Sequence, residues 1–247
     1  MQGLKQVSRK VEIKDKQPKA CLVEIFSSFQ GEGIFVGTKQ IFIRFAGCNL
    51  NCSFCDTSKG AVIKDATVAQ VVGKVKDLEK DFGRHHSVSL TGGEPLLHVS
   101  FLERLLPELK KENLKIYLET NGTLGEELKR IIEYIDIVAM DIKLPSSANI
   151  NPLWNEHIEF LKVAIKKEVF VKVVVNNNTL ESDVVKARDI VARFNKDIPF
   201  ILQPASIDEK GNFKVTKAKL LDYLNLAEEK LSNTRIIPQV HKFLGIK

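Results

Sequence analysis

Short apolar runs alternate with longer amphipathic segments along almost the whole chain, and no other feature constrains the fold as strongly. The short runs are rich in Ile, Val and Phe, as buried strands are. The longer segments repeat apolar residues at helical spacing. Strand, helix and strand in repetition predict a parallel sheet with right-handed crossovers. Strands are expected at 21–26, 40–46, 87–90, 115–119, 135–140, 169–175, 199–202 and 234–237, and helices at 67–82, 100–112, 124–134, 157–168, 182–195 and 217–231.

No internal repeat and no linker rich in Pro or Gly divides the 247 residues. We therefore expect one α/β domain at 21–247, preceded by a basic tail at 1–20. The number of strand–helix repeats falls short of a closed eight-fold barrel, so a partial (β/α)6-type barrel and a doubly wound open sheet both fit. In either architecture the functional residues gather at the carboxyl ends of the strands.

The net charge of +6 is unevenly placed. Residues 1–20 hold six basic and two acidic residues, whereas the other 227 hold 31 basic and 29 acidic residues. A short basic tail is usually just solvated, so no nucleic-acid partner is expected. No segment approaches the ~18 apolar residues that span a bilayer, and the amino-terminal residues carry no apolar export signal. We expect a cytoplasmic protein with no membrane partner.

Three of the four cysteines, Cys48, Cys52 and Cys55, lie within eight residues in a C-x3-C-x2-C pattern, while Cys21 stands alone. A tight, odd-numbered cluster is typical of thiolates kept reduced for a metal. Three thiolates can hold three corners of a four-iron cluster and leave one iron open to a ligand. The alternative is a zinc site completed by a histidine, but the next histidines are thirty residues away and zinc loops usually use pairs of two-residue spacings.

Four further unusual runs follow predicted strands: TGGEP at 91–95, TNG at 120–122, DIK at 141–143 and QPAS at 203–206. Taken singly, each also fits a turn, an ion pair or a helix cap. Their shared place at strand ends favours one common site. In TGGEP the glycines allow a close backbone approach, and Glu94 offers a carboxylate to an ammonium group.

Three other features concern the substrate. The run QGEG at 30–33 combines an amide, a carboxylate and two glycines, which can recognise the edge of a flat polar heterocycle, although a simple turn also fits. Arg44 lies in an alternating strand and would pair either with a substrate carboxylate or with an acid such as Glu24. Lys172 either faces the interior site or is a surface lysine with a buried stem.

The cysteine spacing, with Phe54 before the last cysteine, resembles the radical S-adenosylmethionine superfamily. There the open iron chelates S-adenosylmethionine and passes an electron to its sulfonium, which releases methionine and a 5'-deoxyadenosyl radical. TGGEP resembles the element that binds the methionine amino group. The resemblance implies cofactor contacts at Phe54, Asp56, Gly93, Glu94, Asn121, Asp141, Ile142, Lys143, Gln203, Pro204, Ala205 and Ser206.

A narrower resemblance, to the 7-carboxy-7-deazaguanine synthase family, runs from about Val23 to Lys247 and is carried by EIFSSFQGEG, IFIRFAGCNLNCSFCDT, TGGEP, ETNGT and QVHKFLGIK. It implies a lyase of queuosine biosynthesis that converts 6-carboxy-5,6,7,8-tetrahydropterin to 7-carboxy-7-deazaguanine with loss of ammonia. It also implies one 4Fe-4S cluster, an electron donor such as flavodoxin or ferredoxin, and a homodimer. A Mg2+ would be coordinated by Thr57, since this ion prefers oxygen ligands. The implied pterin contacts are Phe29, Gln30, Gly31, Glu32, Arg44, Thr91 and Lys247.

One departure from that family keeps an alternative open. DIK at 141–143 stands where other members carry a Ser-Pro-Lys type run, and DIK is common in glycyl-radical activating enzymes. Many of those enzymes carry further cysteines for extra clusters, whereas only Cys21 remains here. A second alternative, from another class, is a zinc-containing RNA-binding protein that uses the basic tail.

Overall fold

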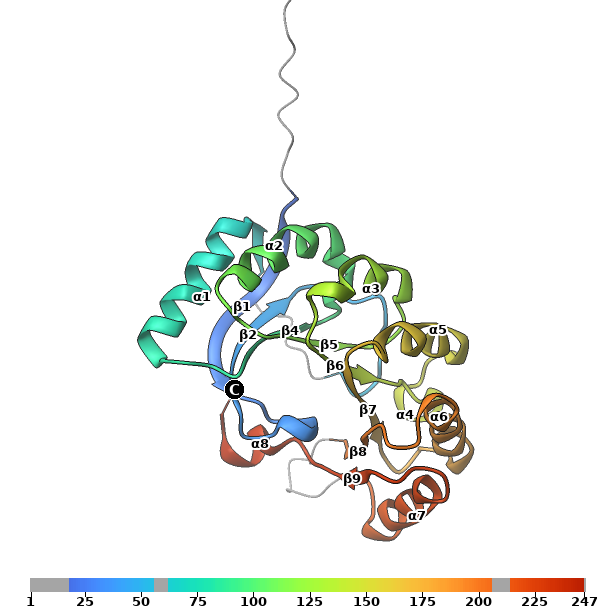
Figure 1. Cartoon of the computed structure of the whole chain (residues 1–247). Helices are drawn as coiled ribbons and strands as arrows, with labels where there is room; N and C mark the ends of the chain where they lie inside the picture. Colours follow the sequence, from blue (N-terminus) through green and yellow to red (C-terminus); the bar gives the residue numbers. More distant parts are fainter. Residues whose placement is uncertain (1–17, 56–61, 206–213, 247) are drawn as a thin grey trace, which may run out of the picture.

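The protein folds around a single nine-stranded sheet within residues 18–55, 62–205 and 214–246, the ranges that the computed structural model describes (Figure 1). All eight predicted strands are present, and β3 is an addition that lies at one edge. In chain order the strands are β1 (Ala20–Phe29), β2 (Lys39–Phe45), β3 (Ile63–Ala66), β4 (Ser87–Gly92), β5 (Ile116–Thr120), β6 (Ile137–Asp141), β7 (Glu168–Val175), β8 (Phe200–Pro204) and β9 (Thr234–Ile236).

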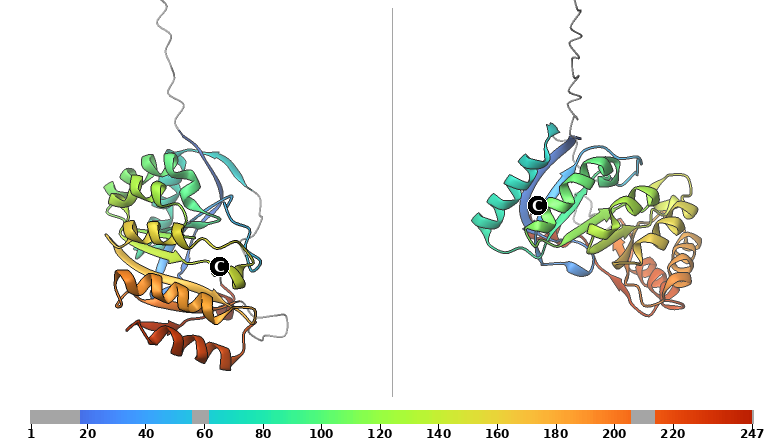
Figure 2. Two further views of the ribbon diagram at one scale, coloured as in Figure 1. Left: turned by 90° about the vertical axis from the view of Figure 1, so that its right-hand side faces the viewer. Right: turned by 45° about the horizontal axis from the view of Figure 1, so that its top comes forward.

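Six helices connect the parallel strands and line the outer, convex side of the sheet (Figures 1 and 2). They are α1 (Val68–Phe82), α2 (Val99–Lys111), α3 (Gly125–Ile131), α5 (Trp154–Ala164), α6 (Glu181–Phe194) and α7 (Lys217–Glu228), each at a predicted position. Shorter elements are α4 (Pro145–Ala148), α8 (Val240–Leu244) and the 3-10 helices η1 (Gly33–Phe35), η2 (Pro95–His98) and η3 (Ile132–Tyr134). In the described ranges, no helix has the length and apolar character that a membrane span needs.

The strand order β3-β1-β2-β4-β5-β6-β7-β8-β9 is that of a curved, open sheet. The prediction of a single-domain, partial α/β barrel is confirmed, and the sheet does not close. The doubly wound alternative is wrong, because the connecting helices lie on one side of the sheet (Figure 1).

The prediction of a parallel sheet was incomplete, because β1 runs antiparallel to both β2 and β3. Residues 30–38 are too few for the crossover that a parallel β1–β2 pair would need. Phe29 at the end of β1 is therefore paired with Lys39 at the start of β2. Segment 30–33 consequently lies at the amino ends of the parallel strands, whereas the cysteine loop follows their carboxyl ends.

The two faces of the sheet are packed differently. The outer face and the helices share the main apolar core, which includes Ile41, Ile43 and Phe45 of β2. The inner face carries a small separate cluster, Tyr117, Ile137, Phe170 and Ile201, against which η1 packs Ile34 and Phe35. Beyond this cluster the inner face is polar. Since strands of a parallel sheet are usually apolar on both faces, the polar inner face indicates a functional site.

Candidate active site

The cysteine loop begins directly after β2. Cys48 and Cys55 are exposed, Cys52 is half-buried, and all three are free thiols. Across the described ranges, no three His, Cys, Asp or Glu side chains are arranged to hold a metal ion. Burial raises the pKa of Cys52, Lys143 lowers it, and Cys48 and Cys55 raise it further. The thiols are thus close enough to influence one another without forming a closed metal site.

The surroundings of these thiols fit an iron–sulfur cluster. The backbone N–H of Leu50 donates to Cys48 Sγ at 3.4 Å, and Asn121 Nδ2 lies 3.8 Å from the same sulfur. Hydrogen bonds of this kind to cysteine sulfur are among the means by which proteins tune iron–sulfur clusters. Phe54 lies near the Lys143 ammonium, with Nζ 5.4 Å from the ring centre. Three free thiols, amide donors and a nearby cation suit an anionic, thiolate-ligated cluster.

The glycines of TGGEP are explained by the cysteine loop itself. A Cβ on Gly92 would lie 2.2 Å from the Phe45 carbonyl oxygen, and one on Gly93 would lie 1.9 Å from the Gly47 carbonyl oxygen. Gly92 also has a φ of +115°. The N–H of Glu94 donates to that Gly47 oxygen at 2.9 Å. The glycines therefore let the backbone before the cysteines lie against the end of β4.

Glu94 is fully buried and points inward. Its carboxylate accepts hydrogen bonds from the N–H groups of Asn121 at 2.8 Å and Leu96 at 3.1 Å, and from the Thr120 hydroxyl at 3.0 Å. Burial raises the pKa of Glu94 to about 7, although these hydrogen bonds lower it. In this arrangement Glu94 holds the turn after β5, and its contact with a methionine ammonium stays a prediction.

His157 of α5, which the sequence analysis did not select, joins the turn after β5 to the run after β6. The ring is fully buried, with Nδ1 2.9 Å from the Gly122 carbonyl oxygen and Nε2 3.2 Å from the Lys143 backbone nitrogen. Burial lowers the pKa of His157 to about 4, although the hydrogen bond to Gly122 raises it. The ring is therefore neutral at pH 7, and it donates from Nδ1 and accepts at Nε2. The sequence did offer one signal for this residue, since a histidine stands within the apolar stripe of a predicted helix.

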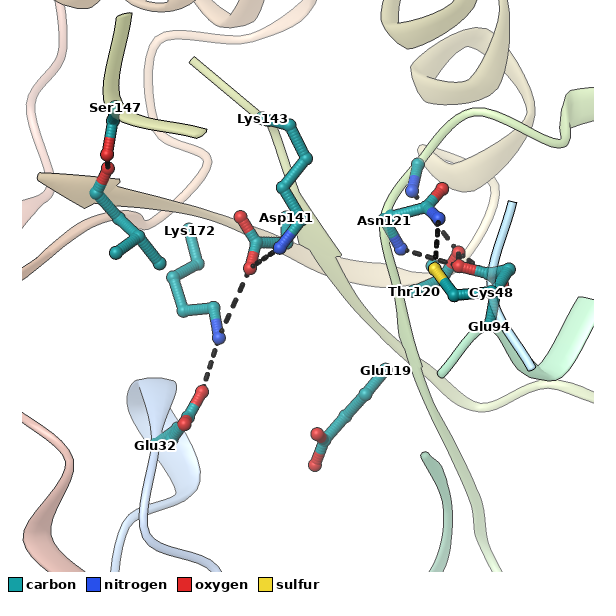
Figure 3. A network of polar contacts seen from close by, with 12 residues as sticks. Glu32, Cys48, Glu94, Glu119, Thr120, Asn121, Asp141, Lys143, Ser147 and Lys172 are labelled. Atoms are coloured by element: carbon teal, nitrogen blue, oxygen red, sulfur yellow. Dashed lines mark hydrogen bonds and ion pairs between the residues drawn. The ribbon is translucent and has the colours of Figure 1, made fainter. Parts of the chain in front are cut away.

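A row of buried charges crosses the inner face (Figure 3). Asp141 Oδ2 lies 2.8 Å from Lys143 Nζ and 3.4 Å from Lys172 Nζ, and Lys172 also pairs with Glu32. Glu32 Oε1 accepts a hydrogen bond from Gln239 Nε2 at 2.6 Å. Burial opposes ionisation, but Lys172 and Gln239 outweigh it and lower the pKa of Glu32 to about 2. Of the two alternatives for Lys172, the interior position is the one observed.

Glu119 is the central residue of this face that the sequence analysis missed, together with Gln40 and Ser89. Its Oε1 accepts from Gln30 Nε2 at 2.8 Å and from the Ser89 hydroxyl at 3.2 Å, and its Oε2 accepts from the Thr91 hydroxyl at 2.9 Å. Gln30 Nε2 also donates to Gln40 Oε1 at 3.0 Å. The role of Glu119 as a shared hydrogen-bond acceptor follows only from the pairing of the strands, because its partners come from β4 and from segment 30–33 while Glu119 itself lies on β5. We call Gln30, Gln40, Ser89, Thr91 and Glu119 the polar floor.

Arg44 lies beside this floor and pairs with an acid of the neighbouring strand. Its Nε is 3.2 Å from Glu24 Oε1, without hydrogen-bond geometry, and its guanidinium lies 5.6 Å from the centre of the Phe26 ring. The structure thus shows the Glu24 alternative. A substrate carboxylate at Arg44 stays a prediction, and the guanidinium has N–H donors besides Nε with which it could bind one.

The remaining predicted residues differ in their surroundings. Phe29 is 50% exposed at the end of β1. Gly31 is packed so closely that a Cβ would lie 2.1 Å from His241 of α8, and its carbonyl oxygen accepts from the Val240 N–H at 2.9 Å. The residues buried at the ends of β6 and β8 are Ile142, Gln203, Pro204 and Ala205. Those outside the described residues are Asp56, Thr57, Ser206 and Lys247.

Besides Arg44 Nε, three buried side-chain atoms on the inner face have no hydrogen-bond partner among the described residues. They are Gln40 Nε2, Asp141 Oδ1 and Gln203 Oε1. A buried polar atom without a partner is unfavourable, so such atoms indicate where a bound ligand can complete the hydrogen bonding. Two of these residues, Asp141 and Gln203, are predicted cofactor contacts.

Comparison with known proteins agrees with this arrangement. Residues 42–184 match the Radical SAM superfamily. The chain is 39% identical to a 7-carboxy-7-deazaguanine synthase from Geobacter sulfurreducens, over 93% of this chain and 98% of the relative. It is 32% identical to the protein of that name from Archaeoglobus fulgidus, over 93% and 100% of the two chains. A crystal structure of QueE from Escherichia coli is similar in fold, with a TM-score of 0.59 and 22% identity over 90% of this chain and 95% of that one.

Proposed function

The chain belongs to the 7-carboxy-7-deazaguanine synthase family of radical SAM enzymes, and from this premise we propose that it converts 6-carboxy-5,6,7,8-tetrahydropterin to 7-carboxy-7-deazaguanine with loss of ammonia. This is the carbon–nitrogen lyase step of 7-deazaguanine and queuosine biosynthesis. The identity to these relatives argues against the first alternative, a glycyl-radical activating enzyme. The match to the Radical SAM superfamily argues against the second, a zinc-containing RNA-binding protein.

The observation that carries the proposal is the position of two residues at the end of β5. Asn121 contacts Cys48 of the cysteine loop, and Glu119 is the centre of the polar floor. Two residues of extended chain span at most about 7 Å. A small substrate on the floor would therefore lie within reach of a cofactor bound at the cysteine loop.

The residues of the site fit the groups that this family uses. Cys48, Cys52 and Cys55 would hold a 4Fe-4S cluster, with S-adenosylmethionine at its open iron and along the ends of β4, β5, β6 and β8. When bound, these two groups supply the one-electron chemistry that starts hydrogen abstraction from the substrate. The protein's own part is to bind, orient and shield the reactants.

The polar floor would bind the pterin. The edges of a pterin ring carry both hydrogen-bond donors and acceptors. On the floor, hydrogen bonds to Glu119 hold the amide of Gln30 and the hydroxyl of Thr91 in place beside the Glu119 carboxylate. A site that is hydrogen-bonded in advance orients its ligand at little cost in entropy. Below the floor, Phe35 packs on Tyr117 and Phe170, which excludes water from that side.

Other parts of the proposal concern partners and boundaries. A Mg2+ coordinated by Thr57 would hold the substrate carboxylate, and removing it with a chelator should abolish turnover until Mg2+ is restored.

We place the catalytic domain at 21–247 after a tail at 1–20, in a cytoplasmic homodimer reduced by flavodoxin or ferredoxin. Sedimentation and assays with each reductant test these points.

Turnover tests the function directly. The protein is reconstituted anaerobically with iron and sulfide, reduced, and mixed with S-adenosylmethionine and the carboxypterin. We expect the ultraviolet absorbance and mass of the deazaguanine, with one ammonia per product. A preparation with a full complement of iron and sulfide that yields no product would overturn the proposal.

A further inference from the structure

Lys172 stands at the centre of the row of buried charges and contacts two separate parts of the site (Figure 3). Its ammonium pairs with Glu32 of segment 30–33, and it lies 3.4 Å from Oδ2 of Asp141 at the end of β6. The Lys172 side chain is 17% exposed. Asp141 and Lys172 are also paired in register across β6 and β7, so the backbone keeps these two side chains adjacent.

On one side of this lysine, Glu32 organises the segment that covers the polar floor. One of its oxygens accepts from Gln239, which ties the segment to the carboxyl-terminal part of the chain. Its backbone N–H donates to Gln30 Oε1 at 3.0 Å, and Gln30 in turn donates to Glu119. Displacement of Glu32 would therefore disturb the floor.

On the other side, Asp141 has two unlike oxygens. Oδ2 is shared by Lys143 and Lys172, whereas Oδ1 has no hydrogen-bond partner among the described residues. Asp141 is 8% exposed. With one oxygen held by two cations, the other is left in a fixed direction as an acceptor for a hydroxyl or amino group.

The charges explain why a lysine is needed at this position. Without Lys172, Glu32 would lose its ion pair, and Asp141 would keep only the pair with Lys143 among the described residues. An uncompensated buried charge is strongly unfavourable, whereas buried ion pairs are often no more stabilising than apolar residues of similar size. The contribution expected from such a pair is a specific arrangement rather than stability.

We propose that Lys172 is a positioning residue that holds Glu32 and Asp141 in one arrangement and thereby couples binding of the substrate to binding of the cofactor. The identity of the two ligands rests on the proposed function, which takes segment 30–33 as a pterin contact and Asp141 as an S-adenosylmethionine contact. The coupling itself is a property of this row of charges.

Binding measurements test the coupling. In the reconstituted full chain without reductant, the dissociation constants of S-adenosylmethionine and of the carboxypterin are measured by equilibrium dialysis, each without and with the other ligand. The factor by which one ligand tightens the other is the coupling, and it should be lost in Lys172→Met. Lys172→Met should raise both dissociation constants by roughly tenfold or more, the usual result of losing a hydrogen bond to a charged group. The matched control is Lys166→Met, an exposed lysine in the turn before β7, which should bind both as wild type does. A Lys172→Met protein that binds either ligand normally would overturn the proposal.

The conservative variant protects this test against loss of folding. Lys172→Arg keeps the charge, but a planar guanidinium cannot reproduce the ammonium position between two carboxylates. Both dissociation constants should rise together, by a smaller factor than in Lys172→Met. A rise in only one of them would show that Lys172 serves a single ligand and does not couple the two.

The ionisation of Glu32 gives a readout that needs neither ligand. The charged and titratable groups that act on Glu32 and Lys172 are these two residues themselves, His241, Asp141, Lys143, Glu119 and Tyr117. With Lys172 removed, burial is opposed by fewer groups, so the pKa of Glu32 should rise from about 2 into the range that carboxyl carbon NMR can follow. His241 is present in both proteins, and the difference between them therefore reports Lys172.

An unchanged Glu32 titration in Lys172→Met would contradict the positioning role even in a chain that makes product. A wild-type chain that makes no product would instead overturn the proposed function. The two failures are thus distinguishable.

Discussion

The cysteine loop and the polar floor lie near each other but differ in how far they are organised. In the loop, two of three thiols are exposed and no metal-binding arrangement of three side chains is present within the described residues. On the floor, both oxygens of Glu119 accept hydrogen bonds from Gln30, Ser89 and Thr91. We therefore expect the floor to be formed by folding and the loop to complete its geometry with the cluster.

The largest expected effect comes from the loop. Cys48→Ser should remove a cluster ligand and reduce product formation to background. Its free energy of unfolding should change by no more than about 0.5 kcal/mol, because the residue is exposed. Iron and sulfide content, product and a denaturant curve measure these three properties. Cys21→Ser, which lies outside the loop, should keep cluster and activity, and equal losses in both variants would contradict the assignment.

The next largest effect comes from the floor. Glu119→Gln replaces an acceptor with an amide that faces existing donors, so kcat/KM should fall about 10- to 100-fold while iron content stays unchanged. The matched control is Glu168→Gln, an exposed glutamate at the start of β7, two strands away in the sheet, which should retain wild-type kinetics. Loss of iron in Glu119→Gln would show that floor and loop are not separate.

Glu94 lies between the two regions and predicts a pH dependence of stability. The pKa of its carboxyl is about 7 in the folded chain against 4.5 for a free glutamate, so the folded state binds more protons between these values. The contribution of Glu94 to the free energy of unfolding should therefore be largest below pH 4.5 and fall as pH rises through 7, by on the order of 3 kcal/mol at most. Unfolding curves of wild type, Glu94→Gln and Glu168→Gln measure this. Only in Glu94→Gln should the free energy of unfolding lose this part of its pH dependence. An unchanged pH dependence in that variant would contradict the burial argument.

The smallest effect concerns the packing below the floor. Phe35 packs edge-on against Tyr117 at 5.7 Å between ring centres. Because it is half-buried, Phe35→Ala should cost about 1–2 kcal/mol and raise KM for the carboxypterin severalfold. Phe82→Ala, at an exposed position at the end of α1, should change neither. If both variants behave alike, the floor does not depend on this support.

The sequence predicted what depends on local pattern. Periodicity located eight strands and six helices, and spacing selected the three cysteines as a candidate cluster site, which stays a prediction. Both depend on residues close together in the chain.

What the sequence did not predict depends on distant pairing. The reversal of β1 follows from the short connection at 30–38, yet it decides which end of the sheet receives Gln30. Glu119 is identified only by its partners from other strands, and Glu32 meets Gln239 from 207 residues away. The glycines of TGGEP were expected to let the backbone approach a ligand, whereas the groups they admit in the structure are Phe45 at the end of β2 and Gly47 before the cysteines.

Binding of the carboxypterin by protein that lacks iron and sulfide tests the contrast between floor and loop most directly. If folding forms the floor, wild type and Cys48→Ser should bind the carboxypterin in equilibrium dialysis, and Glu119→Gln should bind it at least about tenfold more weakly. S-adenosylmethionine binding should appear only after reconstitution of wild type. Carboxypterin binding that requires the cluster, or that survives Glu119→Gln unchanged, would contradict the account.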